Sequence, residues 1–160
     1  MKERLIISCL CTFFLSLSGC MKNAFVDTPD QRKQAVSLAQ RFADACSKNQ
    51  MTTIKQMAGY PFYLDKKWIL LTPYAWEGFI EQMLEAKGTP SSVNLLQANF
   101  LTPEEVQKIS PEFWQLMKKN GFERHAYVML ELQIDQKREQ IAVILQMDEQ
   151  QNWQVVGYTY

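Results

Sequence analysis

The chain has 160 residues, with 17 basic and 17 acidic side chains and a formal net charge of zero. A balance of this kind provides no basic excess, so neither nucleic acid nor an anionic bilayer surface is implied as a partner. Hydrophobic residues make up 47% of the sequence, which is enough for one domain with its own core and excludes a charged, disordered chain.

The first 20 residues have the parts of an export signal. Lys2 and Arg4 form a short basic start, and the segment from Leu5 to Leu17 is apolar and uncharged. As a helix this segment would span about 20 Å, which is too short for a hydrocarbon core of ~30 Å. The pattern therefore predicts a signal peptide over residues 1–19 and not a membrane-spanning helix.

Leu17-Ser18-Gly19-Cys20 resembles the lipobox of bacterial lipoproteins. The resemblance implies cleavage between Gly19 and Cys20, a diacylglyceryl group on the Cys20 thiol and an acyl group on its new amino group. Several acyl chains anchor a protein stably to a membrane. An ordinary secretory signal with Cys20 as a chance neighbour is the alternative. Met21 follows the cysteine, and by resemblance to enteric sorting rules this favours the outer membrane over the inner one.

The rest of the chain divides simply. Residues 20–28 are the acylated cysteine and a short tether, and residues 29–160 form a single domain that faces the periplasm. Cys46 is the only other cysteine after the leader, so no disulfide can form within the mature chain. It lies on the apolar stripe of a predicted helix, where a buried core residue is favoured over a reactive thiol.

Capping and periodicity predict the elements in chain order. A helix starts at Thr28-Pro29, and a shorter one follows. A hairpin, a third helix containing Trp76, and a strand come next. Two short helices then precede three alternating strands that form an antiparallel meander. The corresponding segments are 29–47, 51–58, 62–64 with 68–71, 72–87, 92–101, 102–121, and 122–134 with 141–147 and 153–160.

This order predicts an α+β fold, with helices packed on one face of a curved antiparallel sheet. The chain resembles the nuclear transport factor 2-like superfamily, a cystatin-like cone of sheet wrapped on helices. The segments that carry the resemblance are 42–49 in the first helix, Tyr60-Pro61-Phe62, and 152–157 at the end. The helices between Thr102 and Gly121 depart from that pattern as an insertion.

No catalytic or metal-binding motif is visible. A lone histidine, His125, has no neighbouring cysteine or histidine for a metal site, so no metal is expected. Ketosteroid isomerase-like members of the superfamily use a tyrosine on the first helix and an acid near the first strand. Here the first helix carries Phe42, and Asp65 lies in a predicted turn. We therefore expect no enzymatic activity; a small-molecule isomerase or hydrolase with a cone-shaped pocket is the alternative.

The insertion is the predicted place of function. Phe113 and Met117 share one face of its second helix, and Trp114 points about 100° away. With His125 and Tyr127, these residues form a possible surface for a ligand or partner; the alternative is that both faces pack locally. We expect a non-catalytic binding or assembly module whose partner is an envelope protein or a small apolar ligand. An accessory component of a secretion system is one such role.

Overall fold

The computed structural model describes residues 28–64, 68–79, 82, 92–123 and 125–159. The leader, Cys20 and the tether lie outside the described residues, as do Asp65 and most of the third predicted helix after Phe79. The elements are α1 (Pro29–Ser47), α2 (Met51–Met57), β1 (Ala58–Leu64), β2 (Trp68–Leu70), β3 (Val93–Leu101), α4 (Pro103–Ile109), α5 (Pro111–Lys119), β4 (Ala126–Ile134), β5 (Lys137–Met147) and β6 (Trp153–Thr159).

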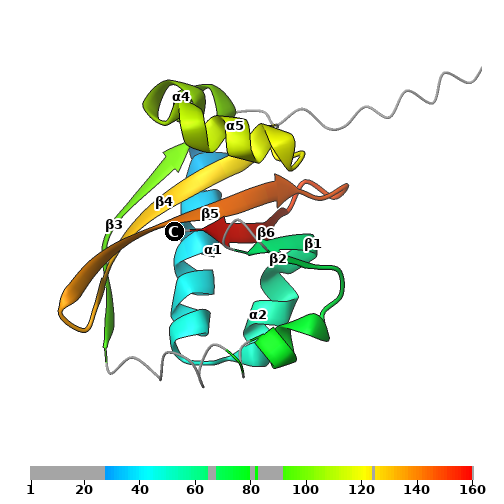
Figure 1. Cartoon of the computed structure of the whole chain (residues 1–160), viewed down its shortest axis with the longest axis vertical. Helices are drawn as coiled ribbons and strands as arrows, with labels where there is room; N and C mark the ends of the chain where they lie inside the picture. The colour runs from blue at the N-terminus through cyan, green and yellow to red at the C-terminus, as the bar shows by residue number, and fades with distance from the viewer. Residues whose placement is uncertain (1–27, 65–67, 80–81, 83–91, 124, 160) are drawn as a thin grey trace, which may run out of the picture.

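The strands form one six-stranded sheet in the order β2-β1-β6-β5-β4-β3. The predicted α+β fold is confirmed: helices pack on a curved, mostly antiparallel sheet (Figure 1). One pairing differs from the expected antiparallel pattern, because β1 and β6 run parallel. These two strands are separated by most of the chain, so no tight turn constrains their relative direction.

One face of the sheet packs against α1. The Thr28 hydroxyl accepts a hydrogen bond from the Gln31 amide and starts this helix as the sequence predicts. Alternate residues of β4 and β5, such as Val128 and Val143, join the core beneath it because side chains alternate between the two faces of a strand. The buried helix residues of this inner core are Ala35, Ala39, Phe42, Ala45, Ile54 and Met57.

The inserted helices α4 and α5 cover the other face. They pack on Tyr127 and Ile144, the sequence neighbours of the inner residues Val128 and Val143, so they lie on the opposite side of the sheet from α1. The expectation of helices on one face alone is therefore wrong. Each inserted helix has an apolar stripe, and only the outer face of the sheet offers a surface that can bury it.

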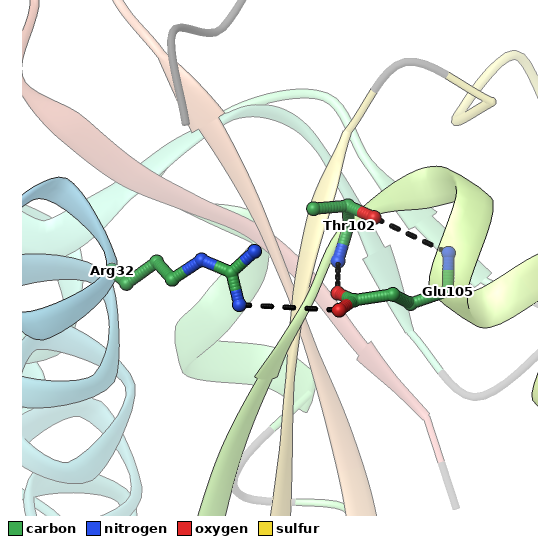
Figure 2. A network of polar contacts seen from close by, with 3 residues as sticks. All are labelled: Arg32, Thr102 and Glu105. Atoms are coloured by element: carbon green, nitrogen blue, oxygen red, sulfur yellow. Dashed lines mark hydrogen bonds and ion pairs between the residues drawn. The ribbon is translucent and has the colours of Figure 1, made fainter. Parts of the chain in front are cut away.

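A polar network fastens the insertion to α1. Thr102 caps α4 in a capping box: its hydroxyl accepts from the Glu105 amide at 3.2 Å, and the Glu105 carboxylate accepts from the Thr102 amide at 2.7 Å. The other Glu105 oxygen lies 3.9 Å from the guanidinium of Arg32 on α1 (Figure 2). Arg32 also lies over the Phe100 ring, 5.2 Å from its centroid. The first turn of α1 and the start of α4 are thus held together at one end of the domain.

Strand β4 begins later than the alternation predicts, at Ala126, whereas β5 begins earlier than predicted, at Lys137. Helix α5 ends at Lys119, and Gly121 follows its cap with a φ of +81°, a conformation that suits glycine and turns the chain back on itself. The Phe122 amide then donates to the Met117 carbonyl at 2.9 Å. This turn places Phe122 in the outer core, and β4 consequently starts at Ala126.

Candidate functional site

The residues predicted as a ligand or partner surface come together beneath the insertion, in what we call the outer cluster. Its buried members come from α4, α5, the turn after α5 and four strands, with four half-buried residues around them. The buried members are Tyr63, Val106, Met117, Phe122, Tyr127, Ile144 and Val156, and the half-buried ones are Leu101, Phe113, Trp114 and Leu116.

Two of the predicted surface residues are not on the surface. Met117 and Tyr127 are both 0% exposed. The Phe113 ring meets the Tyr127 ring edge-on, with 5.7 Å between centroids. The Tyr127 hydroxyl donates to the Phe122 carbonyl at 2.7 Å. Met117 and Tyr127 therefore fill the cluster, because α5 lies directly on this part of the sheet, and neither offers a side chain to a ligand.

Trp114 also packs on the outer cluster and is half-buried. We expected one apolar stripe of α5 to dock on the domain and leave the Trp114 side chain free. The structure differs, because Trp114 is also packed. Both Phe113 and Trp114 contact the domain, since α5 has neighbours on two sides: the sheet and α4. What they present to a partner is the half-exposed remainder of each ring.

The polar edge of the cluster is formed by residues just before β4 and at the end of β5. His125 Nε2 lies 3.3 Å from Gln146 Oε1, and the His125 ring meets Phe122 edge-on at 4.9 Å. One carboxylate oxygen of Glu123 is buried and makes no hydrogen bond to the described residues. Burial raises the pKa of Tyr127, and the charge of Glu123 raises it further. His125 and Gln146 are thus the accessible polar groups beside an apolar cluster.

This arrangement suits recognition better than proton transfer. Tyr127 is held neutral by its raised pKa, and its hydroxyl already donates to a carbonyl. Gln146, which cannot act as a base, is the side chain that the structure places on His125 Nε2. Sequence reasoning did not select Glu123 or Gln146 as site residues. Continuing the β4–β5 register from Ala126 opposite Leu145 places Gln146 opposite His125, so the hairpin register could have identified Gln146.

Aromatic rings fill the inner core. The alternative hypothesis of a small-molecule isomerase or hydrolase would require a cone-shaped pocket there. Phe62 and Trp76 lie 4.6 Å apart between centroids, and Phe42 lies 5.8 Å from Phe62 and 6.1 Å from Trp76. Tyr158 completes the cluster at 6.4 Å from both phenylalanines. Phe42, Phe62 and Trp76 are at most 2% exposed. The rings of α1, β1 and β6 thus pack directly on one another.

Polar groups of the inner core are few. Asp44 is exposed and forms an ion pair with Lys48 at 2.8 Å, so it is not a buried acid. Cys46 is half-buried against the inner core, and burial raises the pKa of its thiol to about 12. Burial also raises the pKa of Tyr60, while the neighbouring Trp76 indole partly offsets this effect. In the described parts of the chain, Thr159 is the only polar residue that is buried as a whole.

Glu77 is exposed and pairs with Lys55. Within the described ranges, no three histidine, cysteine or carboxylate side chains are grouped so that they could hold a metal ion. The helices of those same ranges include none that is both long and apolar enough to cross a bilayer.

Comparison with known proteins identifies the class of fold. No protein-family model matches the chain, and no curated protein matches it. Solved structures do match over most of their length, and they show that the chain has a cystatin-like fold of the nuclear transport factor 2-like kind.

Three such structures illustrate the likeness. A protein of unknown function with a cystatin-like fold from Nostoc punctiforme has a TM-score of 0.55 and 10% identity, covering 84% of this chain and 92% of its own. A cystatin-like fold protein from Burkholderia xenovorans has a TM-score of 0.51 and 13% identity, covering 82% and 91%. A candidate ketosteroid isomerase from Shewanella frigidimarina has a TM-score of 0.50 and 8% identity, covering 79% and 93%. At these identities the likeness concerns the fold alone.

Proposed function

We propose that the protein is a lipid-anchored protein of the bacterial envelope whose domain binds a partner or ligand and catalyses no reaction. The lipobox-like segment Leu17-Ser18-Gly19-Cys20 supports the anchor at Cys20. Seven residues separate Cys20 from Thr28, and an extended chain of this length reaches only ~25 Å. The domain would therefore work close to its membrane, on the periplasmic side and at the outer membrane by preference.

The packed inner core is the observation that most directly supports a non-catalytic role. A small-molecule enzyme with this fold needs a cavity with an acid or base on the concave side of the sheet. Here Phe42, Phe62 and Trp76 occupy that space and are nearly inaccessible to solvent. Asp44 on α1 is exposed and pairs with Lys48.

The surface for recognition is the edge of the outer cluster. His125 and Gln146 supply polar groups, and the half-buried rings of Phe113 and Trp114 supply apolar area. Aromatic side chains beside a few polar groups are typical of the energetic centres of protein interfaces. An envelope protein is thus the favoured partner, and an accessory role in a secretion or surface-assembly machine is compatible with this surface.

Photo-crosslinking in intact cells tests this function. A photoreactive amino acid at Gln146 should yield an adduct with another envelope protein. The same amino acid at Lys137, which is also exposed but lies at the far end of β5, should yield none. The two positions are nine residue steps apart along the strand, or about 30 Å. Equal adducts at both positions, or none at Gln146, would contradict the proposed surface.

An isomerase or other small-molecule enzyme is the second candidate. The buried Tyr60 hydroxyl and Trp76 indole N–H favour it, because neither makes a hydrogen bond of ordinary geometry to the described residues. A ligand carbonyl could accept from either group. Such a ligand should raise the melting temperature of the wild type and have less effect on Tyr60→Phe. Turnover of any such ligand would replace the binding role with the enzymatic one.

A further inference from the structure

The outer edge of β3 is the feature that the proposed function leaves unexplained. β3 is the last strand of the sheet and pairs on one side with β4, and none of the other described strands pairs with its outer edge. It is nine residues long, whereas β2, the strand at the opposite edge, has only three. An edge strand exposes a row of backbone donors and acceptors that can pair with another chain.

The sequence of this edge lacks the usual protection against pairing. Soluble proteins protect edge strands with lysine, other charges or proline. The segment from Ser91 to Leu101 contains no charged residue, no proline and no glycine. Its exposed part is Asn94–Gln97, in which Leu95 and Leu96 are 42% and 44% exposed. A single irregularity interrupts the pairing with β4, since Leu96 has no partner there.

The exposed part of the strand matches itself in one antiparallel register. If two copies pair about a two-fold axis perpendicular to the sheet and centred at Leu96, Leu96 lies opposite Leu96 of the partner subunit, and Leu95 lies opposite Gln97 of the partner subunit. Leucine then meets leucine at the centre of the pairing, and no charge is brought against a like charge. Closed two-fold pairs are also the commonest assemblies of identical chains.

From this edge we propose that β3 is a self-association surface, on which a second copy of this chain pairs antiparallel to form a continuous sheet across the two subunits. The surface is distinct from the edge of the outer cluster, because α4 and the outer cluster lie at the other end of the strand, at Leu101. It does not depend on the lipid anchor or on the partner proposed above. Both copies would keep the His125 and Gln146 surface available.

Disulfide trapping tests the proposal in the full-length protein in its native membrane. In a Cys46→Ala background, Leu96→Cys should form a covalent homodimer on mild oxidation, because residues paired across a two-fold strand contact come within disulfide distance. Ile69→Cys is the matched control: Ile69 is 54% exposed and lies on β2, the opposite edge strand. It should remain monomeric under the same conditions.

A charge variant provides the second measurement. Leu96→Lys brings two like charges together at the centre of the pairing, so the dimer dissociation constant of detergent-solubilised protein should rise about tenfold or more. Its melting temperature as a monomer should change little, because Leu96 is exposed. Trapping of Leu96→Cys no greater than that of Ile69→Cys, a disulfide to a different protein, or a Leu96→Lys dimer as tight as wild type would each overturn the proposal.

Discussion

Replacing Gly157 with alanine should destabilise the junction between β1 and β6. Gly157 pairs with Tyr63 across the parallel strands and with Ile144 on β5. A Cβ at this position would lie 2.7 Å from the Tyr63 carbonyl oxygen, 2.8 Å from Tyr63 Cβ and 3.1 Å from Ile144 Cδ1. The first two atoms belong to a paired strand and cannot rotate away, so the strands would have to separate.

The expected loss of stability in Gly157→Ala is the sum of two opposing effects. Overpacking a well-packed region costs about 1–3 kcal/mol, and fixed neighbours favour the upper part of that range. Alanine also reduces the freedom of the unfolded chain, which offsets about 0.4–1 kcal/mol where its backbone conformation is allowed. Gly157 is not among the positive-φ glycines, so this offset applies. We therefore expect a net loss of about 1–2 kcal/mol, equivalent to a fall in Tm of roughly 3–10 °C for a domain of this size.

Thermal and urea unfolding followed by circular dichroism measure this loss. Gly78→Ala is the matched control, because Gly78 is helical and a Cβ there would meet no atom within 4 Å. That change should stabilise by about 0.5–1 kcal/mol. If Gly157→Ala melts at or above the wild-type temperature, or if Gly78→Ala is the more damaging change, the reasoning about the β1–β6 junction is wrong.

Three further predictions concern the fastening of the insertion and the core thiol. Tyr127→Phe should cost about 1–2 kcal/mol in urea unfolding, because the Phe122 carbonyl loses its buried donor; an unchanged midpoint would contradict this. Thr102→Ala should cost about 1 kcal/mol by removing the α4 cap, and Glu105→Gln should keep more of the stability, since the capping box accepts glutamine. Because burial raises the pKa of the Cys46 thiol from 9.0 to about 12, the unfolded chain loses this proton first as the pH rises. The thiol's contribution to stability should be complete below pH 9 and fall between pH 9 and 12, and Cys46→Ala should show a shallower fall over this range.

Local signals predicted the elements of this fold well. The cap at Thr28 could be predicted from the sequence because the few residues that define a cap also form it, and the Thr102 capping box has the same local origin. The alternation of β4 and β5 predicted inner-face residues such as Val128 and Val143, but not the burial of Tyr127 and Ile144 on the outer face. The parallel pairing of β1 with β6 was missed, since it depends on contacts between residues far apart in the chain.

The candidate site was predicted less well. The sequence correctly grouped Phe113, Met117 and Tyr127 as neighbours of one apolar surface, but it could not show that α5 covers Met117 and Tyr127 completely. Which side of a short amphipathic helix is covered depends on where the helix docks, and that is a property of the tertiary structure. The role of Gln146 similarly required the β4–β5 register. Cys20 was predicted from a motif alone and lies outside the described residues.

The most direct test of the account as a whole is metabolic labelling with palmitate of cells expressing the wild type or Cys20→Ser. The proposed lipid-anchored protein predicts label on the wild type, none on Cys20→Ser, and release of the variant from the outer-membrane fraction. Equal labelling of the two proteins, or an unlabelled wild type that fractionates as a free protein, would contradict the anchor on which the proposed function rests.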